Sequence, residues 1–340
     1  MSAVLEKPLR WKRLVQNLLL SLGVFILCAG AFEIALRFSG YGKLEIYEPD
    51  PALFWKLKPN QDCYTKIGHK PVHINSHGTR GREFSDQKPA DTLRVLCLGD
   101  SRTFGWGLSQ EETYCDILEA LLQKQENQHK RVEVINAGVN AWSYPQMLVY
   151  YRETAARYRP DLVILGEANL WTQFSEQNSP QFVQKFMNRV RLKNILRRFA
   201  IYHFVVEVKL KDFYERNRTR FIPVDPSQDV LFKQQQRDPE TLFRGSIEEL
   251  CKLAQDRGGK PILLYLPSLD EAQATNSSTV LNAKRDLSQK LNLPLVDLTH
   301  EVRTNGKSLY LDADPVHYNT LGNQLIAQRL FQAITPLLVP

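Results

Sequence analysis

Residues 93–105 read LRVLCLGDSRTFG. The part from Leu93 to Leu98 is mostly apolar and has the length of a buried strand, and two glycines flank the polar loop that follows it. An amphipathic helix is expected next, at 114–124. A strand that leads through a loop into a helix is the repeating unit of sheets that carry helices on their faces.

The same alternation of strands and helices continues along the chain. Further strands are expected at 132–135, 162–165, 262–266 and 295–298. Further helices are expected at 145–157, 239–257, 279–291 and 320–334. The pattern predicts an α/β fold, a flavodoxin-like three-layer sandwich with a central five-stranded parallel sheet, interrupted by a helical insertion at about 172–238.

The N-terminal region carries an apolar run long enough to cross a bilayer. The 19 residues from Leu18 to Leu36 are apolar apart from two, and a helix of that length extends roughly 30 Å. Four Lys or Arg precede the run, which favours a cytoplasmic N-terminus. We therefore expect residues 1–37 to be a cytoplasmic tip and transmembrane signal anchor, with the rest of the chain periplasmic or at the cell surface. The alternative is a cleaved signal peptide, because residues 29–31, Ala-Gly-Ala, match a cleavage pattern.

Residues 38–91 are rich in Pro, Gly, Lys and Asn and show no sustained helical or strand period. We expect this segment to be an extracytoplasmic stem that wraps onto the next domain, and two short helical turns in it would be compatible with the sequence. The domain itself is then expected at 92–340.

The positive charge of the chain is concentrated in one segment. The whole chain carries +7, and residues 185–220 contain eleven Lys or Arg against three acids. This distribution argues against a nucleic-acid partner and places any anionic partner at this segment. Leu192, Ile195 and Phe199 belong to an apolar stripe at helical spacing there. The segment is either a lid that contacts anionic lipid or glycan, or a helix that packs its stripe on the core.

Cysteine and histidine spacings do not favour a metal site. The five cysteines lack paired metal-binding spacing, and we expect them to be mostly free and buried. His73 and His77 are four residues apart, as in a helical metal site, but Gly78 disfavours a helix there. We expect neither a metal nor a cofactor.

Polar residues follow the expected strands, at the sheet edge where open parallel sheets bind ligands. They lie in the segments Gly99–Gly105, Asn136–Gly138, Gly166–Asn169 and Asp314–His317. A serine becomes nucleophilic at neutral pH beside a base, and the base needs a third group that holds its tautomer. Ser101, His317 and Asp314 are candidates for these three roles.

In order and spacing, these four segments resemble the conserved blocks of the SGNH family, also called GDSL esterases and lipases, over roughly residues 90 to 335. The resemblance implies that Ser101 is the nucleophile, and that His317 is the base, oriented by Asp314. It also implies an oxyanion hole made of the backbone N–H groups of Ser101 and Gly138 and the side-chain amide of Asn169.

The stem carries a second point of resemblance. Asn75, Gly78 and Arg80 are similar to an Asn-x-x-Gly-x-Arg element of membrane-anchored bacterial members of the family.

The third block departs from the family pattern. It usually reads Gly-x-Asn-Asp, whereas this chain has Gly-Glu-Ala-Asn-Leu at 166–170. Either the loop carries a one-residue insertion that still presents Asn169, which we favour, or the oxyanion hole has backbone donors only. Asp312 is a second candidate for orienting the histidine, and the family spacing selects Asp314.

Three classes of function remain open at this point. The first is a serine esterase that removes acyl or acetyl groups from an extracytoplasmic glycan or lipid. The second is an O-acyltransferase that uses the same triad to modify a cell-envelope polysaccharide. The third is a binding module without activity, against which the intact Ser, His and Asp argue.

Overall fold

This computed structural model of the protein describes residues 6–42, 47–65, 69–125, 131–168, 180–210, 213, 239–276, 278–312 and 314–338. The chain forms two compact units. The first contains residues 1–44 and 195–221, and the second contains residues 45–194 and 222–340.

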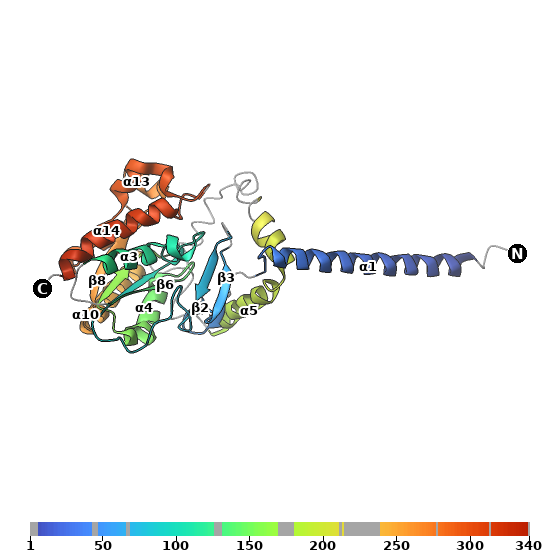
Figure 1. Ribbon diagram of the computed structural model, residues 1–340, viewed down its shortest axis with the longest axis horizontal. Coiled ribbons are helices and arrows are strands. Elements are labelled where there is room, and N and C mark those ends of the chain that lie inside the picture. Colours follow the sequence, from blue (N-terminus) through green and yellow to red (C-terminus); the bar gives the residue numbers. More distant parts are fainter. Residues whose placement is uncertain are drawn as a thin grey trace. The chain divides into compact units, whose positions relative to one another are not determined.

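The second unit is built on a five-stranded parallel sheet (Figure 1). Its strands are β5 (Thr92–Gly99), β6 (Arg131–Gly138), β7 (Leu162–Leu165), β8 (Lys260–Tyr265) and β9 (Leu295–Asp297). Their order across the sheet is β6-β5-β7-β8-β9. The expected five-stranded parallel sheet is confirmed, and the order reverses at β5, where the chain moves from one side of the first strand to the other.

Helices cover both faces of this sheet. The main ones are α3 (Tyr114–Lys124), α4 (Tyr144–Glu153), α10 (Pro239–Asp256), α12 (Thr279–Leu291) and α14 (Thr320–Leu338). One apolar core lies between the sheet and α3 and α14, and a second lies between the sheet and α4, α10 and α12. The arrangement is the predicted three-layer sandwich, with α3 and α14 on one side of the sheet and α4 and α10 on the other (Figure 1).

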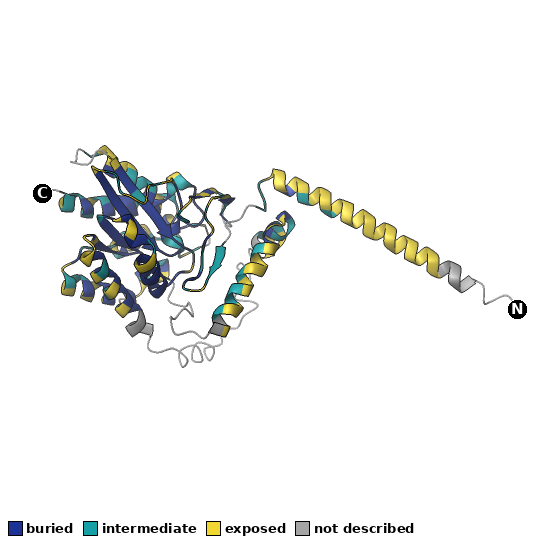
Figure 2. Ribbon diagram, turned by 90° about the horizontal axis from the view of Figure 1, so that it is seen from below, coloured by how far each residue is buried: buried dark blue, intermediate teal, exposed yellow. Residues whose placement is uncertain are grey.

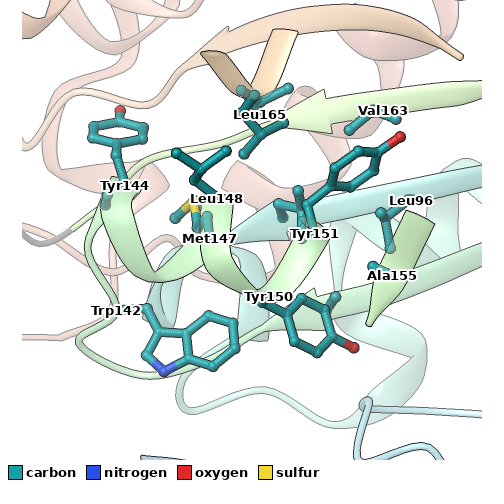
Figure 3. Packing of buried hydrophobic residues seen from close by; sticks show 14 of the residues in the cluster. Leu96, Trp142, Tyr144, Met147, Leu148, Tyr150, Tyr151, Ala155, Val163 and Leu165 are labelled. Atoms are coloured by element: carbon teal, nitrogen blue, oxygen red, sulfur yellow. The ribbon is translucent and has the colours of Figure 1, made fainter. Parts of the chain in front are cut away.

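The core on the α4 side is rich in aromatic side chains. Tyr144, Tyr150 and Tyr151 of α4 lie with Met147 against leucines and valines of β5 and β7 (Figure 3). Burial of large aromatic side chains contributes strongly to core stability. Most strand residues of the sheet are buried, as the dark blue colour of the strands shows (Figure 2).

Shorter elements complete this unit. They are α2 (Ser101–Phe104), η1 (Gln110–Glu112), η2 (Ala155–Tyr158), α11 (Leu269–Gln273), α13 (Thr299–Asn305) and η4 (Gly306–Leu309).

The stem differs from the irregular segment that we expected. It forms two antiparallel pairs, β1 (Tyr47–Asp50) with β2 (Phe54–Leu57), and β3 (Gln61–Tyr64) with β4 (Pro71–Ile74). Each strand has only four residues, which is too short to show a period in the sequence. Arg80 bridges both Ile74 and Asn136 of β6, so the second pair adjoins the edge of the main sheet.

The insertion begins with α5 (Pro180–Leu196), whose first half packs on the stem. The ring of Phe186 stacks on Trp55 with centroids 5.2 Å apart. The expected apolar stripe does not run along one helix, because α5 ends at Leu196 and a new helix starts at Ala200. Leu192 is exposed, so this end of α5 does not pack on the core.

The first unit contains α1 (Glu6–Phe38), α6 (Ala200–Tyr202) and the π-helix η3 (His203–Leu210). From Trp11 to Phe38, α1 is long and apolar enough to cross a membrane. From Trp11 onward, almost all side chains of α1 are exposed (Figure 2).

All five cysteines are free, and four of them are buried, as expected. The exception is Cys28, which is exposed on α1.

Candidate active site

Ser101 directly follows Gly99 and Asp100 at the carboxyl end of β5, the strand at which the strand order reverses. Ligands of open parallel sheets bind at such switch points. Ser101 is the first residue of α2, and the preceding Asp100 caps this helix by accepting the N–H of Arg102 at 2.9 Å. The turn therefore holds the serine hydroxyl at the edge of the sheet, where it is half-buried.

Two glycines allow this turn to be tight. A Cβ on Gly99 would lie 1.9 Å from Oγ1 of Thr103, and a Cβ on Gly138 would lie 2.2 Å from the backbone nitrogen of Phe104. Since real Cβ atoms do not approach other atoms so closely, a larger residue at Gly138 would displace the backbone of α2, and a larger residue at Gly99 would displace the buried side chain of Thr103.

His317 and Asp314 come from the loop before α14. A β-bridge between Tyr310 and Tyr318 closes this loop, and both tyrosine hydroxyls donate to the carbonyl of Pro267. The backbone N–H of Leu269 also donates to the carbonyl of Pro315 at 2.8 Å. The loop is thereby tied to the segment that follows β8.

The structure brings Ser101, His317 and Asp314 into one hydrogen-bonded series. Oγ of Ser101 lies 2.8 Å from Nε2 of His317, and Nδ1 of His317 lies 2.6 Å from Oδ2 of Asp314. Oδ1 of Asp314 accepts the backbone N–H groups of Val316 and His317. This carboxylate therefore faces the ring of His317 in a fixed orientation.

The environment keeps Asp314 ionised. Burial raises the pKa of this carboxyl group, but hydrogen bonds from His317 and from two backbone N–H groups outweigh burial, and the net pKa is lowered. An ionised carboxylate at Nδ1 favours the protonated form of a histidine ring, so this arrangement can support a proton transfer to Nε2 of His317.

The three oxyanion donors expected from the sequence have different surroundings. The Ser101 amide is at the start of α2, where a helix leaves N–H groups without partners of its own. The Gly138 amide donates to Oδ1 of Asn136 at 3.1 Å. Asn169 lies outside the described residues. Three residues after Gly138, exposed Ala141 has φ +63°, a strained conformation for alanine of a kind that clusters at functional sites.

Beneath the serine lies a buried ion pair that the sequence did not single out. Nζ of fully buried Lys284 is 2.7 Å from Oε1 of Glu167, and it also donates to the carbonyls of Gly166 and Leu264. The carbonyl of Glu167 in turn accepts the N–H of Asp100 at 2.8 Å. The pair thus ties together the carboxyl ends of β5, β7 and β8. Lys284 lies in the amphipathic helix α12, and the sequence of that helix does not indicate that this lysine is buried in an ion pair.

A second ion pair flanks the serine. The guanidinium of Arg102 binds both carboxylate oxygens of Asp100 and donates to the carbonyl of Leu266 at 3.0 Å. Burial lowers the pKa of Arg102, but the adjacent carboxylate outweighs it, and the net pKa is raised. Arg102 therefore remains charged next to the serine.

The stem residues that resemble membrane-anchored family members have defined contacts. The guanidinium of Arg80 is buried and donates to the carbonyls of Phe104, Gly105 and Leu108. Asn75 accepts the N–H groups of two later residues of its turn, and Gly78 adopts φ +74° there. The stem thus holds the loop that follows Ser101.

The two histidines whose spacing resembles a helical metal site lie outside the candidate active site. His73 is on β4 beside Asp62, and His77 is in the following turn, 2.9 Å from Asp86. Asp312 is exposed, and the carboxylate that contacts His317 belongs to Asp314.

Comparisons with known proteins agree with this architecture. The model of the GDSL-like Lipase/Acylhydrolase family matches residues 97–325. No curated protein sequence matches the chain.

Similar solved structures include TesA, with 13% identity over 72% of this chain and 99% of that one, at a TM-score of 0.46. A lipase/acylhydrolase from Enterococcus faecalis has 13% identity, covers 73% and 97%, and has a TM-score of 0.45. The psychrotrophic esterase EstA from Pseudoalteromonas sp. has 16% identity, covers 72% and 98%, and has a TM-score of 0.44.

The family match covers well over half of the 340 residues and includes the serine turn, the carboxyl ends of the first strands and the Asp314–His317 loop. The chain belongs to the GDSL-like lipase/acylhydrolase family, and it is a hydrolase that cleaves ester bonds.

Proposed function

We propose that this chain is a membrane-anchored serine esterase that removes acyl or acetyl groups from an extracytoplasmic glycan or lipid. The observation that supports the proposal most directly is the hydrogen-bonded series of Ser101, His317 and Asp314. A serine hydroxyl becomes an effective nucleophile when a positioned base accepts its proton, and the 2.8 Å distance from Oγ to Nε2 suits that transfer.

In the proposed mechanism, Oγ of Ser101 attacks the ester carbonyl carbon while its proton moves to Nε2 of His317. Asp314 accepts the Nδ1–H of His317 throughout and stabilises the imidazolium. His317 then protonates the leaving alcohol, and an acyl group remains on Ser101. Water then attacks the acyl carbon and gives a proton to Nε2 of His317. The bond between the acyl carbon and Oγ breaks, the carboxylic acid leaves, and His317 returns the proton to Oγ of Ser101.

The negative charge on the ester oxygen requires donors that are in place before the reaction. We propose the backbone N–H groups of Ser101 and Gly138 and the amide of Asn169 for this role. Loss of one such donor typically lowers turnover by about 10² to 10³.

We further propose that residues 1–37 are the anchor, 38–91 the stem and 92–340 the hydrolase domain, with the hydrolase domain outside the cytoplasm. The apolar, exposed α1 and the four cations before its apolar run support this topology. Nothing in the described site favours a sugar hydroxyl over water as the acyl acceptor, and the transferase is therefore not proposed.

The test uses the full chain in detergent with nitrophenyl esters from acetyl to long acyl chains. Wild type should hydrolyse part of the series and react with a fluorophosphonate probe. Ser101→Ala should lose both properties, whereas the matched control Ser308→Ala, at an exposed serine, should keep them. Labelling of Ser101→Ala would refute the assignment of the nucleophile. Release of the protein from membranes by carbonate, as a fragment that starts near residue 32, would refute the anchor.

A further inference from the structure

The carboxyl end of α1 is built into a junction with the helical segment 198–210. Both carboxylate oxygens of Glu33 are used, because they accept the backbone N–H groups of Ala200 and Ile201 at 2.9 Å each. The first N–H groups of a helix have no partner within that helix, and Glu33 therefore acts as the cap of α6 from a distant part of the chain. This contact explains the single acid in the apolar run.

Further contacts fix the same segment on α1. Nη2 of Arg37 donates to the carbonyl of Arg198 at 2.7 Å, and the N–H of Gly42 donates to Nδ1 of His203 at 3.0 Å. The ring of Phe204 lies edge-on to Phe32 and to Tyr41, with centroids 6.0 and 5.2 Å away. These contacts hold α6 and η3 against the end of α1 as one packed piece.

This piece exposes large apolar side chains that the contacts with α1 do not cover. Phe199, Leu210 and Phe213 are each more than half exposed, at 54%, 54% and 56%. Val205 and Val206 between them are also exposed. Soluble surfaces rarely expose contiguous apolar patches of this kind, and such patches mark contact with a partner or a membrane.

Charges at the junction locate it at the boundary of a bilayer. Glu33 and Arg37 are the only charged residues between Leu18 and Phe38, so their ion pair, at the C-terminal end of the apolar run, marks where α1 would leave the hydrocarbon. Arg198 and Lys209 add two cations on the docked segment, and Nζ of Lys209 lies 5.5 Å over the ring of Phe204. Cations beside exposed apolar groups suit the headgroup region of anionic lipids.

We propose that segment 199–210, with Phe213, is an amphipathic interfacial segment of the membrane. Its apolar side chains lie at the acyl-chain boundary and its cations lie at anionic headgroups. The proposal rests on the membrane anchoring proposed above. The proposed partner of this basic and apolar segment is anionic lipid. The segment can reach the lipid because it packs on the end of α1.

The test places an environment-sensitive NBD fluorophore on single cysteines in the full chain, reconstituted in nanodiscs of anionic lipid. The background is Cys28→Ala, because the other four cysteines are buried and do not react. Labels replace Val206 and Leu210 in separate proteins, Leu20 of α1 serves as the anchoring control, and exposed Gln328 of α14 serves as the solvent control.

Labels at 206 and 210 should shift to shorter emission wavelengths and be quenched more by lipids with a shallow doxyl group than by lipids with a deep one. The label at 328 should do neither. If the labels at 206 and 210 behave like the label at 328 while the label at 20 is quenched, the interfacial placement of segment 199–210 is wrong and the membrane anchor is supported. If 20 is unquenched as well, the anchor fails too. A blue shift at 206 and 210 without lipid quenching would mean that protein covers the segment, which also overturns the proposal.

Charge reversal provides a second measurement. Replacing Lys209 with Glu should weaken the quenching at 206 in anionic nanodiscs and leave it unchanged in zwitterionic ones. If quenching at 206 in anionic nanodiscs is the same for this variant as for wild type, the electrostatic part of the proposal is refuted.

Discussion

Replacing Lys284 with Met removes a fully buried ammonium group that has three acceptors. They are Oε1 of Glu167 at 2.7 Å and the carbonyls of Gly166 and Leu264 at 3.1 and 2.5 Å. Methionine has a similar volume and leaves no large cavity. The change therefore isolates the loss of the charge and of its hydrogen bonds.

The expected cost is large because one partner remains behind. Glu167 is 3% exposed, and without Lys284 its carboxylate is a buried charge next to Tyr144 and the backbone of Leu266. Breaking a buried pair on one side typically costs about 3 to 5 kcal/mol. That is a substantial part of a total stability of roughly 5 to 15 kcal/mol.

Removing the charge of Glu167 as well should restore part of the lost stability. In the double variant Lys284→Met with Glu167→Leu, no uncompensated charge is left. Apolar replacement of a whole buried pair is often neutral. The carbonyls of Gly166 and Leu264 still lose a donor, so recovery should be partial, and the double variant should be at least about 1 kcal/mol more stable than Lys284→Met alone.

Urea unfolding of the full chain in detergent, followed by tryptophan fluorescence, measures these differences. The matched control is Lys290→Met, on the same helix, where the lysine is 59% exposed and pairs with Glu248 at 2.8 Å. Exposed pairs contribute about 0 to 1 kcal/mol. If Lys284→Met costs no more than Lys290→Met, the reasoning on the buried pair is refuted.

Three further predictions concern the site and its surroundings. Asn169→Ala should lower turnover by about 10² to 10³ while Ser101 still reacts with a fluorophosphonate, and an effect below about threefold would mean that its amide does not reach the oxyanion. Gly138→Ala should destabilise the fold and lower expression, since its Cβ would overlap the backbone of α2; a variant with unchanged thermal unfolding would contradict the close approach. Glu112→Gln should destabilise the protein at pH 7 but not near pH 2. Burial raises the pKa of this carboxyl group, hydrogen bonds from Ser109 and Thr320 outweigh it, and the pKa falls from 4.5 to about 2. The stability it provides is thus present above pH 4.5 and lost toward pH 2, and a difference between wild type and variant that stays constant over this range would refute the assignment.

The sheet and its helices could be predicted from the sequence because their signals are local. The buried strand at 93–98 and the helices at 114–124 and 279–291 each carry an apolar period or an apolar run of the right length. The order of these elements is enough to indicate a parallel sheet, since right-handed crossovers leave few alternatives. The candidate serine, histidine and aspartate could be named for the same reason: each follows or precedes an element whose end the sequence marks.

Other features depend on contacts between distant residues, which no local pattern encodes. The four-residue strands of the stem pair with one another and brace the site through Arg80. The side chain of Lys284 is indistinguishable in sequence from those of exposed lysines on its helix, and only packing against Glu167 decides that it is buried.

Periodicity and the residues at strand ends are properties of short segments, and for that reason the parallel sheet, the apolar N-terminal helix and the candidate triad can all be predicted before any coordinates are known. Three contacts follow from tertiary packing alone: Oγ of Ser101 lies 2.8 Å from His317, the Gly138 amide binds Asn136, and Glu33 caps α6. Each of these contacts joins groups whose separation depends on how whole elements pack, and their geometry is therefore set by the assembled core rather than by neighbouring residues.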